Sequence, residues 1–335
     1  MAEFPPLIQA LLDGKAYPEK PAHVDLVQTH LSFVFLLDGY VYKIKKPVNF
    51  GFVDFSTLEK RRFYCQQEVK LNSRLSPTVY LGVVEVVQNG AVFSIGGFGK
   101  VAEYAVKMRK LPLDRCLDRL LSENQVVPEM LSKVAQKLAE FHRNSESGDE
   151  ISKYGGIETV SKNTGENFDE TEKYIDVSIP RKTYETIKSF TVDFIESQAD
   201  LFRQRIEGGR VKDCHGDLHL AHICFDDEIF IFDCIEFNDR FRYCDVASEI
   251  AFLAMDLDFH GRPDLSVHFV DSYVDLSGDQ ELLKLLNFYK CYRAYVRGKV
   301  ESFKLDDPHV SEDEKARVAI VSGKYFDLAE SYTFS

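Results

Sequence analysis

Hydrophobic and polar residues alternate along much of the first third of the chain, as they do in β-strands with one buried face. Two of these runs flank Asp38-Gly39 and another two flank Asn89-Gly90, and both dipeptides favour tight hairpin turns. The strands predicted from this pattern are Val24–Gln28, Phe33–Leu37, Tyr40–Lys45, Leu81–Val87, Ala91–Ile95 and Val101–Met108.

A helical spacing of apolar residues replaces the alternation in the rest of the chain. A short helix is predicted at Pro6–Leu12 and a long one at Thr57–Leu75, within the strand-rich part. After Leu111-Pro112 the predicted helices are Asp114–Leu121, Val127–Arg143, Glu166–Tyr174, Lys182–Ile206, Asp245–Phe259, Leu282–Phe303 and Ser311–Glu330. Two short strands, Ile223–Phe225 and Ile229–Phe232, interrupt this helical region.

These elements predict an α+β protein with two lobes. Residues 1–110 would form a small β-rich lobe with one long helix, and residues 111–335 would form a larger, mainly helical lobe. The chain of 335 residues is long enough for each lobe to have its own core. A cleft between two lobes is a usual place for a ligand, so we expect a binding site there.

Composition restricts the class of ligand. The chain has 41 basic and 54 acidic residues, a net charge of −13. This balance argues against a nucleic-acid-binding surface and suits a small, cationic ligand better. No signal peptide or membrane-spanning run is predicted, and the seven cysteines are interpreted as buried hydrophobic residues. We therefore expect a cytoplasmic protein with no membrane or nucleic-acid partner.

Acids and histidines flank the two short strands of the helical region. His215, Asp217 and His222 precede the first strand, and Asp233 follows the second. An antiparallel pair would bring Asp217 and Asp233 to the same end of the hairpin. Two nearby carboxylates are costly unless a cation lies between them, and Mg²⁺ is commonly bound by carboxylates together with substrate phosphates. One acid could then bind the metal while the other accepts a proton from a hydroxyl group.

These motifs resemble a known family. The strings HGDLHLAHI and IFDCIEF are similar to those of aminoglycoside phosphotransferases and choline kinases, which have a protein-kinase-like fold. Together with VYKIKKPVNFGFVDFSTLEKR and DVASEIAFLAMDLD, they look most like bacterial aminoglycoside-phosphotransferase-like proteins that are often fused to a P-loop kinase domain. The resemblance implies ATP and Mg²⁺ as cofactors, Asp217 as the catalytic base, His215 as its orienting residue and Asp233 as a metal ligand.

The N-terminal lobe should supply a phosphate-binding lysine and a helix glutamate that holds it. Lys43, in the strand segment YVYKI, is the preferred lysine, and Lys45 on the same strand face is the alternative. Glu68 resembles the family's helix glutamate and is preferred to Glu59.

Two further segments are expected to contact the nucleotide. Ser32 lies in the stretch Thr29–Ser32, which could cover the phosphates, although a glycine-rich motif is absent from it. The join between the lobes resembles an adenine-binding hinge. Its residues are Met108, Arg109, Lys110 and Leu111. The glycine-rich stretch Gly96–Lys100 lacks P-loop spacing and is interpreted as a strand connection.

One position departs from the family pattern. His222 stands where the family usually has Asn, and a ring nitrogen suits Mn²⁺ better than Mg²⁺. His222 could bind the metal, could hydrogen-bond Asp217, or could mark an impaired site. A zinc site is a separate alternative, and its candidate ligands are Cys214, His215, His219 and His222.

The sequence therefore predicts an ATP-dependent kinase that phosphorylates a hydroxyl group of a small molecule. An aminoglycoside-like compound, a sugar or an amino alcohol would fit, and a cationic acceptor would suit the acidic chain. The alternative is a catalytically impaired nucleotide-binding module with a regulatory role.

Overall fold

The computed structural model describes residues 4–308 and 310–334. The chain divides into two compact units. The first unit contains the residues up to Leu120 together with Ala221–Asp239, and the second contains Leu121–Leu220 together with the residues from Arg240 onward. Residues 221–239 thus fold with the N-terminal part of the chain, although they follow the predicted join at residue 110 by more than a hundred positions.

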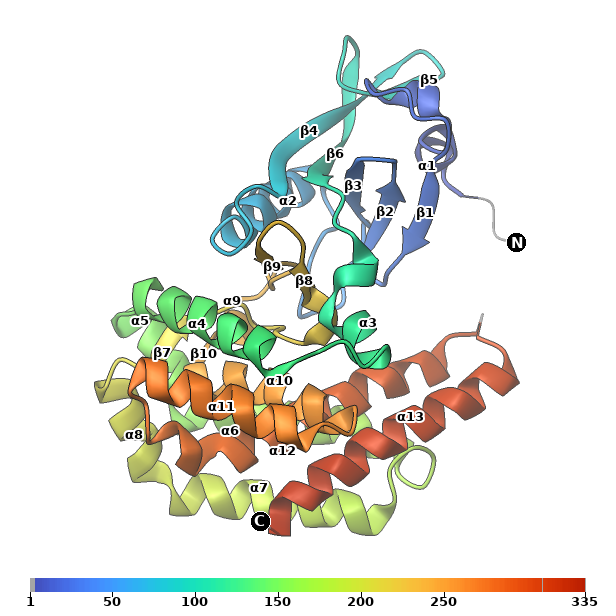
Figure 1. The fold of residues 1–335 in the computed structure, drawn as a ribbon. Helices are drawn as coiled ribbons and strands as arrows, with labels where there is room; N and C mark the ends of the chain where they lie inside the picture. The colour runs from blue at the N-terminus through green and yellow to red at the C-terminus, as the bar shows by residue number, and fades with distance from the viewer. Residues whose placement is uncertain (1–3, 309, 335) are drawn as a thin grey trace. The chain divides into compact units, whose positions relative to one another are not determined.

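The first unit is built on a six-stranded antiparallel sheet with the strand order β1-β2-β3-β6-β4-β5 (Figure 1). Its strands are β1 (Asp25–Gln28), β2 (Ser32–Leu36), β3 (Tyr40–Lys45), β4 (Tyr80–Asn89), β5 (Val92–Ile95) and β6 (Lys100–Arg109). Both predicted hairpins are present, because β2 pairs with β3 and β4 pairs with β5. Gly90 has a φ of 62°, a left-handed conformation that glycine adopts readily.

Two helices accompany this sheet. Helix α1 (Pro6–Ala10) is short, and helix α2 (Leu58–Asn72) packs against β4 and β6 (Figure 1). Helix α2 begins after Thr57, whose side chain accepts a hydrogen bond from the Lys60 amide and so caps the helix. The predicted long helix is therefore confirmed, with its ends shortened.

The hairpin formed by β8 (Ile223–Phe225) and β9 (Ile229–Ile231) completes the first unit. Cys224 and Phe230 of this hairpin are fully buried, in a hydrophobic cluster that also contains Cys65 of α2 and Val106 of β6. This packing fixes the segment that follows β9, which carries Asp233, on the N-terminal sheet and helix.

The second unit is mainly helical, as predicted. Its helices are α4 (Pro128–Asn144), α5 (Asp149–Ser152), α6 (Ile157–Thr171), α7 (Arg181–Ser197), α8 (Ala199–Glu207), α10 (Val246–Phe259), α11 (Pro263–Ser277), α12 (Leu282–Ser302) and α13 (Glu312–Ser331). A two-stranded ladder joins β7 (Val211–Asp213) to β10 (Tyr243–Asp245). Two short helices, α3 (Leu117–Ser122) and α9 (Asp239–Arg242), lie where the chain passes from one unit to the other.

Helix α10 lies at the centre of the second unit. Every residue from Val246 to Leu257 is buried, and the helix packs against α11 and α12. Asp245 caps its first turn by accepting a hydrogen bond from the Ala247 amide. Such complete burial explains why most of the segment is apolar, with Glu249 as one of its few buried polar residues.

The helices differ from the prediction in several places. The segment 263–277 was not predicted to be helical but forms α11, which begins with Pro263 at a position where proline is favoured. Helix α6 begins at Ile157 rather than at residue 166. The helix predicted at 182–206 is broken at Gln198, whose ψ of 18° lies outside the helical range, so that α7 and α8 are separate. The spacing of apolar residues indicates that a segment is helical but does not show at which residue the helix begins, ends or breaks.

Among the described residues all seven cysteines are free thiols. Six of them are buried, and Cys244 is intermediate. The interpretation of the cysteines as small buried residues is thereby confirmed, with Cys244 the least buried.

Candidate active site

A cluster of buried charges lies in the first unit, around Lys43 of β3. The Lys43 ammonium is 2.9 Å from Oε1 of Glu68 and 2.6 Å from Oδ1 of Asp233. Burial disfavours the charge on Lys43, but these two carboxylates outweigh it and hold the lysine pKa well above its usual value. Lys43 is therefore a fixed positive charge with access to solvent, because 15% of its side chain is exposed.

Lys45 occupies the same strand face two residues later and is more deeply buried. Its ammonium is 2.7 Å from Oε2 of Glu68 and also pairs with Glu236. Its side chain is only 1% exposed. Both lysines thus share Glu68, and Lys43 is the one with the more accessible ammonium group.

Strand and helix periodicity explain this arrangement. Side chains alternate across a strand, so Lys43 and Lys45 face one side of β3 while Tyr42 and Ile44 enter the core on the other side. Glu68 projects from α2 and is fully buried, whereas Glu59, in the first turn of the same helix, is exposed. Burial raises the carboxyl pKa of Glu68, but the two lysines reverse this effect and lower it overall. The expected Lys43–Glu68 contact is present, and Glu59 lies outside it.

Asp233 follows strand β9 in an unusual backbone conformation. Its φ is 61°, in the left-handed region that non-glycine residues rarely adopt. The Asp233 amide donates to the Tyr80 hydroxyl at 3.0 Å, and the next amide, that of Cys234, donates to Oδ1 of Asn72 at 2.8 Å. The second carboxylate oxygen of Asp233 is 3.7 Å from Nε2 of His222. The two predicted metal ligands are therefore neighbours.

The donor set of Asp233 and His222 fits a divalent cation. The carboxylate side chain is 43% exposed, and one of its oxygens faces a ring nitrogen that can also act as a ligand. A mixed oxygen and nitrogen set suits Mn²⁺ at least as well as Mg²⁺, which prefers oxygen.

The other predicted nucleotide-binding residues lie in the same unit. Ser32 is buried opposite Lys45 in the β2–β3 ladder, and its amide donates to the side chain of Thr29 at 3.0 Å. At the end of β6 the Arg109 amide donates to Val79, and the Lys110 amide donates to Gly39.

The backbone at the end of β6 is largely committed to contacts within the first unit. Met108 pairs with Val41 and Tyr80 in the sheet, and Leu111 is buried. The amides of residues 109 and 110 are thus used inside the sheet, so an adenine ring would have to be recognised by other groups of this segment.

The loop His215-Gly216-Asp217 lies in the second unit and is held through its backbone. Oε1 of Glu249, on helix α10, accepts hydrogen bonds from the amides of His215 at 2.6 Å and of Gly216 at 2.7 Å. Gly216 has a φ of 87°, which a side chain would oppose. The Arg293 guanidinium, on helix α12, donates to the Gly216 carbonyl at 3.2 Å.

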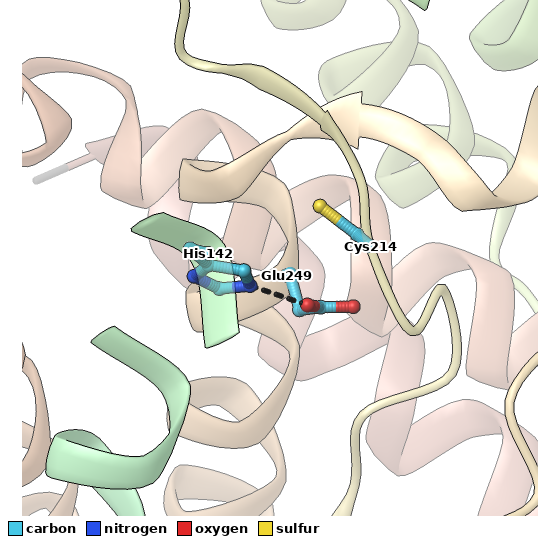
Figure 2. Close-up of side chains that lie close together, drawn as sticks. All are labelled: His142, Cys214 and Glu249. Carbon is cyan, nitrogen blue, oxygen red and sulfur yellow. Dashed lines mark hydrogen bonds and ion pairs between the residues drawn. The ribbon is translucent and has the colours of Figure 1, made fainter. Parts of the chain in front are cut away.

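A buried histidine fixes the carboxylate that holds this loop. Figure 2 shows His142 of α4 beside Glu249, and Nε2 of His142 lies 2.6 Å from Oε2 of the carboxylate. The other ring nitrogen is 2.8 Å from the hydroxyl of Tyr273 on α11. Burial raises the pKa of Glu249, but the contact with His142 and the loop amides lowers it to about 2. Helices α4, α10, α11 and α12 thus all support the loop.

Asp217 itself has a partly exposed carboxylate. Its amide donates to Nδ1 of His215 at 3.3 Å, and its Oδ2 is 3.6 Å from Nε2 of His219. The side chain is 35% exposed, while the His215 ring is fully buried. The backbone of the loop is thus held by Glu249 and Arg293, while the Asp217 carboxylate stays partly exposed.

A second cluster of potential ligands is better explained by hydrogen bonding than by metal binding. His142, Cys214 and Glu249 each have a donor atom within 4.8 Å of the others, and all three are buried (Figure 2). However, the carboxylate oxygens and both ring nitrogens already have partners, and the Cys214 thiol contacts the Cys244 carbonyl at 3.6 Å. Burial also raises the pKa of the Cys214 thiol well above its usual value.

Several residues of these sites were not predicted from the sequence. Glu249, His142 and Arg293 support the loop, while Asn72 and Tyr80 hold the Asp233 turn. The sequence did contain an indication of Glu249. A glutamate inside the apolar stretch VASEIAFLAM is expected to be buried, and a buried carboxylate needs hydrogen-bond or charge partners.

No family model matches the chain. Three curated relatives, from Mycobacterium tuberculosis and Mycobacterium bovis, are each 34% identical over 303 residues and are each named an uncharacterized protein. The match covers 89% of this chain but only 59% of each relative. The chain therefore spans about three fifths of the length of these proteins.

Solved structures define the class of fold. A choline/ethanolamine kinase family protein from Mesorhizobium loti has a TM-score of 0.52 and 10% identity, over 98% of this chain and 100% of that one. An ethanolamine kinase from Plasmodium vivax has a TM-score of 0.50 and 10% identity, over 93% of this chain and 82% of that one. The chain thus has the protein-kinase-like fold of choline and ethanolamine kinases. The resemblance predicted from the sequence is confirmed at the level of the fold.

Within the residues that the structure describes, none of the helices is both long and apolar enough to cross a lipid bilayer.

Proposed function

We propose that the protein is an ATP-dependent phosphotransferase that transfers a phosphoryl group to a hydroxyl of a small molecule. The observation that carries the proposal is the Lys43 ammonium, which contacts a buried helix glutamate at 2.9 Å and the solvent-accessible Asp233 at 2.6 Å. This lysine, glutamate and aspartate set is the one that phosphoryl transfer in kinase folds requires.

Lys43 would bind the phosphates of ATP. Glu68 keeps its ammonium charged and directed toward Asp233, so that the lysine is oriented before the nucleotide arrives. Lys45 is too deeply buried to be the first choice for this contact, and it neutralises Glu68 and Glu236 instead.

Asp233 and His222 would hold the divalent cation. The cation, when bound, would neutralise charge on the phosphate oxygens. The chain's own contribution is to keep the Asp233 carboxylate exposed, with Lys43 on one oxygen and His222 near the other.

Asp217 would accept the proton of the acceptor hydroxyl. Its exposed carboxylate matches this role, and Glu249 and Arg293 fix the backbone of the loop that carries it. His215 would orient Asp217, because its ring nitrogen accepts the Asp217 amide hydrogen bond. Holding the base in one position reduces the entropy that must be lost in the transition state.

The acceptor is proposed to be a small amino alcohol, sugar or aminoglycoside-like compound. One of the structures with the same fold is named an ethanolamine kinase. The net charge of −13 favours a cationic acceptor over an anionic one.

One observation favours a second candidate function, an impaired nucleotide-binding module with a regulatory role. A ring nitrogen of His222 stands beside Asp233, where the resembled family has an asparagine oxygen. Such a module would bind ATP without turning it over.

The test combines nucleotide binding with transfer. The protein is incubated with ATP and Mg²⁺ or Mn²⁺ and a panel of amino alcohols, sugars and aminoglycosides, and phosphorylated product is measured by mass spectrometry. Asp217→Asn should abolish transfer and leave ATP affinity within about twofold of wild type. Wild-type turnover in that variant would contradict the assignment of the base, and ATP binding without any turnover would favour the regulatory module.

A further inference from the structure

Three buried polar residues follow one another at helical spacing along α2 and its C-terminal extension. They are Glu68, Asn72 and Ser76, which are at most 1% exposed. The Ser76 amide donates to the Asn72 carbonyl at 2.9 Å, so the helical spacing continues past the end of α2. Residues four apart lie on one helix face, so these three form a polar stripe.

The polar stripe contacts the segment from Ile231 to Glu236 at successive points. The Ser76 hydroxyl donates to the Ile231 carbonyl at 2.8 Å, and Oδ1 of Asn72 accepts from the Cys234 amide at 2.8 Å. Glu68 binds Lys45, which in turn pairs with Glu236. The stripe therefore holds the segment on both sides of Asp233, directly at Ile231 and Cys234 and through Lys45 at Glu236.

The orientation of the Asn72 amide is determined by its second hydrogen bond. Its Nδ2 donates to the Glu68 carbonyl at 2.9 Å, within the helix. With the amino group committed there, the side-chain oxygen must face the Cys234 amide. Asn72 is thus a fixed acceptor rather than a mobile one.

Tyr80 provides the second acceptor for the turn. Its hydroxyl accepts from the Asp233 amide at 3.0 Å, and its side chain is buried in the cluster that contains Cys65 and Phe230. Asp233 has no glycine-like freedom, so a φ of 61° is maintained only when its surroundings compensate. Two adjacent amides pointing at Tyr80 and Asn72 supply that compensation.

The turn decides where the Asp233 carboxylate points. In this conformation one oxygen lies 2.6 Å from Lys43 and the other 3.7 Å from His222. A change of φ to the usual negative range would rotate the Cα–Cβ bond and move the carboxylate away from both groups.

We propose that Tyr80 and Asn72 are positioning residues of the phosphotransferase, which hold the left-handed turn so that Asp233 presents its carboxylate to the divalent cation. This inference rests on the proposed function, since it concerns the same site. It assigns a role to two residues that touch neither the reacting atoms nor the cation.

The experiment measures ATP affinity by calorimetry, once with Mg²⁺ and once with EDTA, so that the gain due to the metal is obtained directly. Tyr80→Phe removes one buried oxygen and keeps the ring, and Asn72→Leu keeps the shape and removes the acceptor. Each variant should keep the affinity measured in EDTA and lose the metal-dependent gain by about tenfold.

Tyr42→Phe is the matched control. Tyr42 is fully buried in the same sheet, and its hydroxyl donates to Glu19 at 3.0 Å, away from the Asp233 segment. This variant should keep the wild-type gain. If the substitutions only damaged the fold, the ATP affinities measured with Mg²⁺ and with EDTA would fall together, or Tyr42→Phe would also lose the metal-dependent gain.

The outcomes separate the two proposals. If wild-type protein does not bind ATP at all, the proposed function fails. If wild-type protein shows the metal-dependent gain and folded Tyr80→Phe and Asn72→Leu retain it, the positioning role is wrong. If one variant does not fold, the other decides. If both unfold where Tyr42→Phe is folded, the contacts maintain the fold rather than the turn, and the positioning role is again contradicted.

Discussion

His142 and Glu249, 107 residues apart in the chain, form a buried contact of 2.6 Å beneath the loop that carries Asp217. The same carboxylate accepts the amides of His215 and Gly216. These partners place the Glu249 carboxylate at the centre of a buried hydrogen-bond network. We therefore expect its removal to destabilise the second unit.

Glu249→Gln should lower the free energy of unfolding by about 2–3 kcal/mol, because charge-assisted hydrogen bonds are replaced by weaker ones and a donor is left without a partner. Urea denaturation measures the loss. Glu150→Gln is the control, since Glu150 is 89% exposed and its ion pair with Lys153 lies at the surface. Equal stability of the two variants would show that the buried contact contributes little.

The low pKa of Glu249 predicts how this contribution depends on pH. A carboxyl whose folded pKa is about 2 binds its proton more weakly than in the unfolded chain, where the value is about 4.3. Its contribution to stability is therefore fully present above about pH 4.3 and is lost as the pH falls toward 2. The difference in unfolding free energy between wild type and Glu249→Gln should shrink over that interval. A difference that stays constant from pH 5 to pH 2.5 would contradict this origin.

Substitutions of the two lysines of β3 should have different effects, one mainly on ATP affinity and the other mainly on the free energy of unfolding. Lys43→Met should weaken ATP binding more than Lys45→Met does, because the Lys43 ammonium is the more accessible one. Lys45→Met should instead reduce unfolding free energy by about 3–5 kcal/mol, since it leaves Glu68 and Glu236 buried without this cation. Calorimetry with ATP and urea denaturation measure the two effects. The reverse ranking in ATP affinity would identify Lys45 as the phosphate lysine.

His222→Asn should change the preferred metal. Replacing the ring nitrogen by an amide oxygen beside Asp233 should lower the preference for Mn²⁺ over Mg²⁺ by about tenfold. The preference is measured as the ratio of ATP affinities in the two metals. His23→Asn is the control, because the His23 side chain is 77% exposed beside Asp25 and is not a candidate ligand. An unchanged ratio in His222→Asn would show that this ring is not a ligand.

Local patterns predicted much of the fold. The alternation around Tyr40–Lys45, the two glycine-containing turns and the long helix that carries Glu68 depend on residues close in sequence, and all are present. The boundaries of α6, the break at Gln198 and the whole of α11 were missed, because contacts with neighbouring helices decide where such segments begin and end.

Local alternation along β3 was enough to place Lys43 and Lys45 on one strand face, and the sequence also contained the acids and histidines of both sites. The three-dimensional packing was needed to show that Glu68 is shared by both lysines, that Asn72 and Tyr80 accept the amides of the Asp233 turn, and that Glu249 accepts the amides of the loop at His215. The periodicity of apolar residues shows on which side of a strand or helix a residue lies, and this depends only on residues close in sequence. The partner that a buried polar group finds depends on packing between segments far apart in the chain, and a single sequence does not record that packing.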